Sequence, residues 1–299
     1  MQRLFLLDAN SLIHRAFHAL PPFVNKSGEA TGAIYGLANI LLKILKEDAP
    51  DFIAAFFDRP EPTFRKEIFE DYKIHRPKAP PELISQIITA RELFRCLGIK
   101  TFELAGLEAD DLIGTAAEKF KNNLDLQIVI LTGDLDALQL VLNEKIIAKT
   151  FKKGVSETVV YGEKEVAERY GLGPESLRDY KALIGDSSDN IPGVPGIGPK
   201  TAVNLLKKYG DLDALLKNGQ GEKNYPQLAA SEKQILLSKK LAAIVRDAPL
   251  EINLEELIYR GYQVRDLTDY FEKMGFQSLI KRIGGELAQN EKSKIRSLF

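Results

Sequence analysis

Residues 3–8 read RLFLLD, a short apolar run that ends in a carboxylate. An apolar run without polar alternation is typical of a strand buried on both faces of a parallel sheet. Three more such runs follow, with helix-like stretches between them. We expect strands at residues 3–7, 52–57, 100–104 and 127–131, an edge strand at 157–161, and helices at 31–47, 81–97 and 108–122. This alternation predicts an α/β fold with a mostly parallel sheet flanked by helices.

Acidic residues follow each of the four main strands, and the later, helical half of the chain adds two more. The nine are Asp8, Asp58, Glu108, Asp110, Asp111, Asp134, Asp136, Asp186 and Asp189. Because the carboxyl ends of parallel strands lie at one edge of a sheet, we expect these groups to converge there. Converging carboxylates raise one another's pKa unless cations lie among them. Oxygen ligands with few histidines nearby suit Mg²⁺ or Mn²⁺, and two such ions are the usual means of phosphodiester hydrolysis.

Each acid taken alone also has a simpler explanation. Asp8, Asp134 and Asp186 could each cap a helix N-terminus, and the acids at 108–111 could interact with the positive end of a helix. In a regular helix, Glu108 and Asp111 share a face on which Asp110 does not lie. We therefore expect either an irregular first turn or a lesser role for Asp110.

Residues 58–81 depart from the alternation of strands and helices. They carry prolines at both ends and a charged, aromatic middle. A segment of this length between a strand and a helix is usually functional or disordered. We expect a partly helical excursion from the sheet.

A loop rich in glycine and proline, IPGVPGIGPK at residues 191–200, precedes an apolar helical run. Its glycines permit tight turns and close approach of the backbone. Free N–H groups beside Lys200 would face a phosphate of a nucleic-acid backbone. A rigid turn between two helices is the alternative. A nucleotide P-loop does not fit, because Pro199 displaces Lys200 by one position and no strand is expected before the loop.

Five stretches of the chain occur in the order found in one known family. They are LLDANSLIHRAFHALP (6–21), TFRKEIFEDYKIHRP (63–77), GLEADDLIGT (106–115), TGDLDALQLV (132–141) and IGDSSDNIPGVPGIGPKTA (184–202). Over roughly residues 3–285 the chain therefore resembles the 5′ nuclease domain of bacterial DNA polymerase I and its stand-alone relatives, the bacterial 5′–3′ exonucleases and flap endonucleases. Two departures, Ala9 where a glycine is expected and Leu135 where a lysine is common, remove no carboxylate.

The resemblance implies a structure-selective, metal-dependent nuclease that acts on free 5′ ends, 5′ flaps and RNA primers in DNA replication and repair. It implies two Mg²⁺ ions, for which Mn²⁺ can substitute. One ion or its surroundings would involve Asp8, Asp58, Glu108, Asp110 and Asp111. The other would involve Asp134, Asp136, Asp186 and Asp189.

The resemblance also implies contacts with DNA. Residues 60–81 would form the family's helical arch, in which Lys73 and Arg76 reach the scissile phosphate and Tyr72 stacks on a base. Cationic donors at that point stabilise the phosphoryl charge, and stacking is independent of base sequence. For Arg65 we expect a phosphate contact and a structural ion pair equally. Residues 186–210 would form a helix–three-turn–helix motif that binds duplex DNA through Gly193, Gly196, Gly198 and Lys200, with K⁺ held by backbone carbonyls.

We expect a nuclease core with its arch at residues 1–163, a helical DNA-binding region at 164–285 and a loose tail at 286–299. The single cysteine excludes a disulfide framework within one chain, and no export signal or membrane-spanning pattern is visible. We therefore expect a monomeric, cytoplasmic protein. It is either a stand-alone enzyme or the amino-terminal piece of a polymerase, so a polymerase domain or protein is the expected partner.

Two alternatives stay open at this point. One is a non-catalytic protein that binds branched DNA, although all nine acidic positions are filled. The other is an enzyme of small nucleotides, suggested by the spacing of Gly193 and Gly198. The net charge of −1, from 41 Lys and Arg against 42 Asp and Glu, at first argues against a nucleic-acid binder. Setting the nine acids aside leaves 33 acidic groups against 41 basic ones, a net of +8 that suits a phosphate backbone.

Overall fold

The computed structural model describes residues 1–154 and 157–285, and a six-stranded sheet forms its centre. The strand order is β3-β2-β1-β4-β5-β6, and every neighbouring pair is parallel except β5 and β6. The strands are β1 (Gln2–Asp8), β2 (Phe52–Phe56), β3 (Lys100–Phe102), β4 (Leu126–Leu131), β5 (Ile146–Lys153) and β6 (Glu157–Tyr161). The expected α/β fold and the five expected strands are confirmed. Strand β5 was not expected, because its lysines interrupt the apolar run by which the other parallel strands are recognised.

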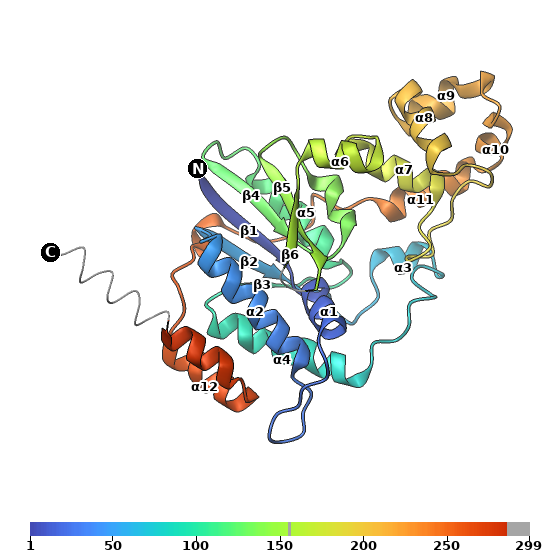
Figure 1. Cartoon of the computed structure of the whole chain (residues 1–299). Helices are drawn as coiled ribbons and strands as arrows, with labels where there is room; N and C mark the ends of the chain where they lie inside the picture. The colour runs from blue at the N-terminus through green and yellow to red at the C-terminus, as the bar shows by residue number, and fades with distance from the viewer. Residues whose placement is uncertain (155–156, 286–299) are drawn as a thin grey trace.

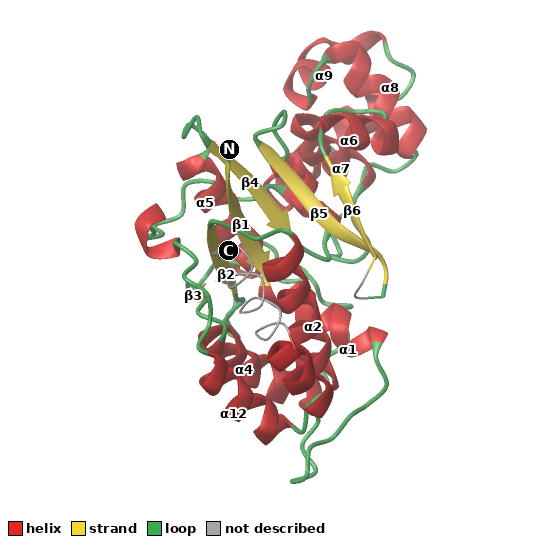
Figure 2. Ribbon diagram, turned by 60° about the vertical axis from the view of Figure 1, so that its left-hand side comes forward, coloured by secondary structure: helices red, strands yellow, loops and turns green. Residues whose placement is uncertain are grey.

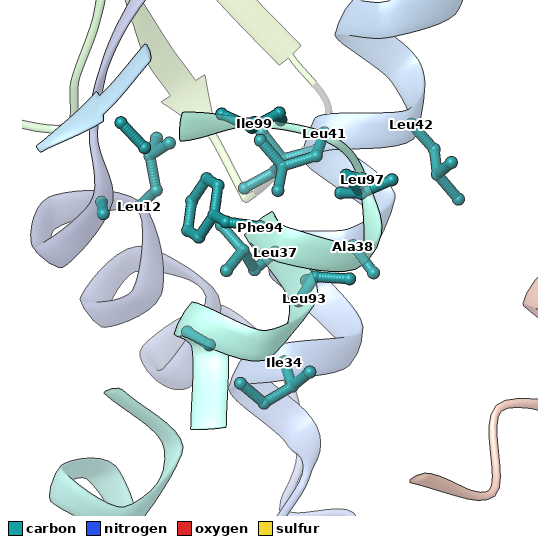
Figure 3. Packing of buried hydrophobic residues seen from close by; sticks show 14 of the residues in the cluster. Leu12, Ile34, Leu37, Ala38, Leu41, Leu42, Leu93, Phe94, Leu97 and Ile99 are labelled. Carbon is teal, nitrogen blue, oxygen red and sulfur yellow. The ribbon is translucent and has the colours of Figure 1, made fainter. Parts of the chain in front are cut away.

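Helices cover both faces of the sheet (Figure 2). Alternate residues of β1 point to opposite faces, so Phe5 and Leu7 belong to one hydrophobic cluster while Leu4 and Leu6 belong to another. The first cluster packs under α1 (Ala9–Ala19), α2 (Gly32–Glu47), α4 (Pro81–Cys96) and α12 (Val264–Met274). The second packs under α5 (Ala109–Phe120). Figure 3 shows the centre of the first cluster, where Leu12 of α1, Leu37 of α2 and Phe94 of α4 come together.

A separate group of helices, here called the helical lobe, comprises residues 172–242. It has its own hydrophobic centre, which includes Leu183, Leu206 and Ile235. Its helices are α7 (Leu177–Ile184), α8 (Pro199–Tyr209), α9 (Leu212–Asn218), α10 (Tyr225–Ala230) and α11 (Glu232–Ala242), with short 3₁₀ turns at Pro174–Ser176 and Gly219–Gly221. Helix α6 (Glu163–Tyr170) links the lobe to β6. In Figure 1 the lobe projects to the upper right of the sheet.

The chain leaves the lobe after α11 and returns to the helices that cover the sheet. Ile252 and Leu257, the latter in a 3₁₀ turn at Leu254–Leu257, join the cluster under α5. Phe271 of α12 and Ile283, in the helical residues 277–285, join the opposite cluster. Figure 1 shows α12 beside α2 and α4, far from α8 and α9. The region expected at 164–285 is thus divided between lobe and core, because its last apolar residues pack on the sheet layers; the tail expected at 286–299 lies outside the described residues.

Residues 58–80, here called the bridging segment, connect β2 to α4 and contain one short helix, α3 (Phe64–Ile68). The expected partly helical excursion is therefore present. The segment packs against the lobe: Tyr72 shares a hydrophobic cluster with Ile191 and Leu241, and the Lys73 N–H donates to the Asp189 carbonyl at 2.9 Å. In the part of the chain that the structure describes, no helix is both long and apolar enough to cross a membrane.

Candidate active site

A cleft of about 790 Å³ opens at the carboxyl edge of the sheet, between α1, the N-terminus of α5 and the bridging segment. Five of the nine predicted acids and both predicted arch cations line it: Asp8, Asp58, Glu108, Asp110, Asp134, Lys73 and Arg76. Asp136 and Asp186 line an adjoining cavity of about 300 Å³. Strand ends, together with the loop after α7 that carries Asp186, therefore bring these acids to one edge.

Asp8 ends β1 and caps α1. Its Oδ1 accepts the Ser11 N–H at 3.0 Å, and its Oδ2 accepts the Thr132 hydroxyl at 2.7 Å. The side chain is almost fully buried. Burial first, and then the neighbouring Asp58 carboxylate, raise the pKa of Asp8 to about 6. Asp8 therefore caps α1 with one oxygen, as a simple helix cap would, and also lies beside Asp58 in the group of acids at the sheet edge.

Asp110 lies at the centre of the carboxylate cluster. Its Oδ1 is buried and, among the described residues, has no hydrogen-bond partner. Burial, followed by repulsion from Asp8 and then Asp134, raises its pKa well above the ordinary value. Burial also raises the pKa of Asp58, whose Oδ1 accepts the Ala109 N–H at 2.7 Å. Asp110 therefore lies among the other acids of the cleft, and its role stays a prediction.

Asp111 turns the other way and is fully buried. Glu108 caps α5, and Asp111 at the third helical position accepts the Glu108 N–H at 3.1 Å, which completes a capping box. The guanidinium of Arg65 binds both carboxylate oxygens of Asp111 at 2.7 Å. Asp111 therefore has no oxygen free for a metal ion. Arg65 is 3% exposed, so of its two expected roles it takes the structural ion pair and not the phosphate contact.

The bridging segment supplies cations and a hydroxyl to the cleft. Lys73 Nζ donates to Glu108 Oε1 at 2.8 Å, and Arg76 Nη2 donates to Asp189 Oδ1 at 2.5 Å. The Tyr72 hydroxyl donates to Asp189 Oδ2 at 3.1 Å and to Glu108 Oε2 at 3.2 Å. The Tyr72 ring is 4% exposed, so in this structure it cannot take the base-stacking position that the family resemblance predicted.

A second group of acids lies where the lobe meets the sheet edge. Asp134 caps the 3₁₀ turn Leu135–Leu140, as the cap explanation expected. Lys181 Nζ lies between Asp136 and Asp186 and donates to both, at 2.6 Å to Asp186 Oδ2. Burial outweighs that lysine at Asp136 and raises its pKa to about 6. At Asp186 the hydrogen bonds from Lys181 and Ser188 outweigh burial and lower the pKa to about 2.

The loop between α7 and α8 closes through its glycine backbones. Gly185 has φ +76°, and a Cβ there would lie 2.6 Å from the Gly193 nitrogen. Asp186 and Ile191 exchange two backbone hydrogen bonds of 2.8 Å across the loop. Gly193 is therefore needed for this close approach. Its contact with DNA stays a prediction.

Beyond the closed loop the chain is open to solvent. A Cβ at Gly196 or Gly198 would meet no atom within 4 Å, and Lys200 is exposed at the start of α8. Lys200 also lines a groove of about 690 Å³ with Tyr170 and Tyr180. Residues that a DNA backbone could approach are therefore Gly196, Gly198 and Lys200.

The carboxylates suit hard divalent cations by their chemistry, since the donors are all oxygens. A partnerless buried oxygen on Asp110 and raised pKa values at Asp8 and Asp58 mark negative charge that this chain does not neutralise. The cations of the chain neutralise other acids: Lys73 binds Glu108, Arg76 binds Asp189 and Lys181 binds Asp136 and Asp186. As these side chains stand, no three His, Cys, Asp or Glu residues in the described ranges converge closely enough to hold a metal ion. The donor set therefore fits such ions, although the side chains do not form a finished coordination sphere.

Sequence reasoning missed two residues of this edge. Lys181 lies one helical turn and a half before Asp186 in KALIGD, a spacing that could have indicated a contact. Thr132 follows β4 directly, and its hydroxyl binds Asp8. Thr132 is a polar residue at the end of β4, as Asp8 is at the end of β1, and this position could have indicated a role at the same sheet edge.

Comparisons with known proteins cover nearly the whole described chain. A family model described as 5′–3′ exonuclease, N-terminal resolvase-like domain, matches residues 3–171, and one described as 5′–3′ exonuclease, C-terminal SAM fold, matches residues 172–265. The 5′–3′ exonuclease of Aquifex aeolicus (strain VF5) is 36% identical over 300 residues, which is all of both chains. DNA polymerase I of Bacillus subtilis (strain 168) is 40% identical over 98% of this chain, which spans 33% of that polymerase.

A solved structure of T5 5′-exonuclease with bound zinc is similar in fold. It superposes with a TM-score of 0.67 at 22% identity, over 81% of this chain and 89% of the phage protein. The catalytic core of Rad2 in complex with a DNA substrate superposes with a TM-score of 0.57 at 18% identity, over 92% and 88%. At such identities the likeness concerns the fold alone.

Proposed function

The chain belongs to the 5′–3′ exonuclease family, and we propose that it hydrolyses phosphodiester bonds near 5′ ends and 5′ flaps of DNA with the help of divalent metal ions. The observation that carries this proposal is the acidic cleft at the sheet edge, where the buried Asp110 Oδ1 has no partner among the described residues. An uncompensated buried carboxylate is costly unless a cation binds it.

The metal ions would be held by two groups of carboxylates, one that receives no ion pair in the described structure and one that binds cations of the chain. Asp8, Asp58, Asp110 and Asp134 line the cleft and would hold one ion. Asp136, Asp186 and Asp189 would serve the other, with Glu108 beside the first. When bound, such ions would supply Lewis-acid activation of water and charge stabilisation at the phosphate. We propose Mg²⁺ as the natural ion and Mn²⁺ as a substitute.

Lys73 and Arg76 would bind the scissile phosphate. Each already binds a carboxylate oxygen, of Glu108 and Asp189 respectively, so a phosphate oxygen can replace one anion by another at the same cation. Charge that grows on the phosphoryl oxygens in the transition state would be stabilised by both groups. Their place on the bridging segment would put the 5′ strand between that segment and α1.

The duplex would bind along the lobe, where Lys200 and the open backbone at Gly196 and Gly198 face solvent. K⁺ at these carbonyls, cleavage of RNA primers, a monomeric state, a cytoplasmic location and partnership with a DNA polymerase are further parts of the proposal. The polymerase I relatives, of which this chain spans about a third, support the last of these.

The experiment is cleavage of a labelled 5′-flap duplex in MgCl₂ or EDTA by the wild type, Asp110→Asn and Asp125→Asn. Asp125 is an exposed acid before β4, at the sheet edge opposite the cleft, and is the matched control. We expect Mg²⁺-dependent cleavage by the wild type and the control, and none by Asp110→Asn. A wild type that binds the flap but never cuts it in Mg²⁺ or Mn²⁺ would be a DNA-binding protein without this activity.

Lys73→Ala separates chemistry from binding. We expect a cleavage rate about a hundredfold lower, the order of loss found when one preorganised donor is removed, and nearly unchanged affinity for the duplex. Single-turnover rates and fluorescence anisotropy give the two quantities. If affinity falls as much as the rate, Lys73 only positions the DNA.

A further inference from the structure

The buried ion pair of Arg65 and Asp111 is satisfied at every polar atom that is described. Besides the two bonds to Asp111, Arg65 donates from Nε to the Leu241 carbonyl at 2.9 Å and from Nη2 to the Ala243 carbonyl at 2.6 Å. Asp111 also accepts the Val245 N–H at 2.9 Å. The guanidinium lies 4.7 Å from the centre of the Phe64 ring. Charge and hydrogen bonds are therefore both balanced in a site closed to water.

These contacts connect three parts of the molecule that are far apart in sequence. Arg65 lies in α3 of the bridging segment, and Asp111 lies in the first turn of α5. Leu241 and Ala243 lie where the lobe ends and the chain returns to the core. Further along that return, the Ala248 N–H donates to Thr115 Oγ1 at 3.1 Å. The return therefore runs along α5 and is fixed to it at two points, Val245 and Ala248, by side chains of that helix.

The first turn of α5 carries two acids of the cleft. Glu108 is held by its main chain to Asp111 and by its side chain to Lys73 and Tyr72. Asp110 is the residue next to Asp111 and points to the opposite side, into the carboxylate cluster. A rotation of this turn would move Glu108 and Asp110 together. What holds Asp111 therefore fixes where both cleft acids lie.

We propose that Arg65 is a positioning residue, which through Asp111 fixes the first turn of α5 against the end of the helical lobe and so places Glu108 and Asp110 for metal binding and catalysis. This inference rests on the proposed nuclease function and adds to it a residue that touches neither substrate nor metal ion. DNA bound by the lobe is thereby connected to the acids of the cleft through one guanidinium.

A purely stabilising role does not require this arrangement. A buried ion pair can often be replaced by apolar groups at little cost in stability, so its presence is weak evidence for that role. The planar guanidinium, in contrast, donates hydrogen bonds to two carboxylate oxygens and two carbonyl oxygens in fixed directions. A lysine carries the same charge on a single nitrogen and cannot satisfy these four acceptors in the same directions.

The experiment compares Arg65→Lys with the wild type and with Arg246→Lys. Arg246 is the matched control, because it is an exposed arginine of the same return segment whose described partner is the Gln139 carbonyl. For each protein, thermal unfolding by circular dichroism sets a temperature at which it is folded. At that temperature we measure the single-turnover rate on a 5′-flap duplex, the dissociation constant for that duplex in EDTA, and the Mg²⁺ concentration that gives half the maximal rate.

For Arg65→Lys we expect a rate about a hundredfold lower, as small misplacements of catalytic groups produce, with a dissociation constant within about threefold of the wild type and a higher half-maximal Mg²⁺ concentration. Arg246→Lys should keep the wild-type rate and Mg²⁺ dependence. If Arg65→Lys is less stable yet cuts at the wild-type rate when folded, Arg65 is structural only and the inference is wrong.

The same measurements distinguish a failure of the proposed function from a failure of the role proposed for Arg65. A wild type without metal-dependent cleavage contradicts the proposed function itself, whereas an active wild type matched by Arg65→Lys contradicts only the role of Arg65. Should Arg65→Lys not fold, Asp111→Asn removes the same pairing at nearly constant volume. It is expected to show the same loss of rate and the same rise in Mg²⁺ requirement, and a wild-type rate in that variant would overturn the inference.

Discussion

Raising the pH from about 4 to about 7 should destabilise the metal-free protein. Two buried acids of the site, Asp8 and Asp136, have pKa values raised from 3.8 to about 6. In the unfolded chain their pKa values return to about 3.9. Between these values the folded protein holds protons that the unfolded protein has lost. The stability that this difference supplies is complete below about pH 4 and is lost as the pH rises through 6.

The magnitude follows from the size of the difference. A pKa raised from 3.8 to about 6 corresponds to about 3 kcal/mol for a single carboxyl group. Asp58 and Asp110 act in the same direction. Asp186 acts in the opposite direction, but its pKa of about 2 confines its effect to pH values below about 4. A loss of a few kcal/mol is large against the 5–15 kcal/mol that typically separates folded from unfolded domains.

The assay is urea unfolding followed by circular dichroism at pH 5, 6, 7 and 8 in EDTA, for the wild type and Asp8→Asn. His14, whose pKa is lowered by burial and then by His18, makes the folded protein more stable as the pH rises through 6.5. Because both proteins contain His14, its effect cancels in the difference between them, which reports Asp8 together with its repulsion of Asp110. We expect Asp8→Asn to gain about 1.4 kcal/mol relative to the wild type from pH 5 to pH 8, because the rest of the difference is already lost between pH 4 and pH 5.

Mg²⁺ provides the second half of the same test. A cation that binds only the folded protein at a hundred times its dissociation constant adds about 2.7 kcal/mol. Saturating MgCl₂ should therefore restore the stability of the wild type at pH 8 and leave Asp8→Asn less affected. A wild type in EDTA whose stability relative to Asp8→Asn does not change with pH would refute the reasoning, since its Asp8 would then be ionised without cost.

Three further predictions concern single parts of the site. Asp110→Asn should raise the urea midpoint in EDTA at pH 8 while abolishing cleavage, because it removes an uncompensated buried charge; a lower midpoint would contradict that burial. Gly193→Ala should destabilise the lobe by about 1–3 kcal/mol, because the new Cβ would overlap the backbone of Ile184. Calorimetry that shows an unchanged melting temperature would rule out the close approach. Affinity for a flap duplex should fall as salt rises, and Lys200→Ala should reduce the slope by about one, as expected for one phosphate contact; equal slopes would place Lys200 away from the DNA.

The strands and their terminal acids could be predicted from the sequence, because both signals are local. An apolar run of five residues and the acid that follows it are adjacent in the chain, as at Leu7 and Asp8. The unexpected β5 shows the limit of that signal: a strand near the sheet edge is half exposed, so Lys149 is tolerated and its head binds Asp48 at 2.6 Å. The edge strand expected at 157–161 is present as β6.

The contacts of individual side chains could not be predicted in the same way, because they depend on segments far apart in sequence. Asp110 and Asp111 are neighbours of the same type, and helix geometry alone favoured Asp111 for the cleft. Asp111 instead faces Arg65, 46 residues earlier, and Val245, 134 residues later. Tyr72 is buried for a similar reason, since its hydroxyl contacts Asp189. A sequence pattern shows which residue types are present, but packing between distant segments decides which of them face the cleft.

The cations of the chain therefore sort the nine acids into groups with different chemistry. Arg65 neutralises Asp111 permanently, because that pair is buried and every oxygen is occupied. Lys73 and Arg76 are partly exposed, so their bonds to Glu108 and Asp189 can be exchanged for bonds to a phosphate. Asp8, Asp58 and Asp110 receive no cation in the described structure beyond distant ones, and burial raises the pKa of each. We infer that a divalent ion would bind first at these three acids. An arriving phosphate would then take the place of Glu108 at Lys73 and of Asp189 at Arg76, and would leave these three acids bound to the ion.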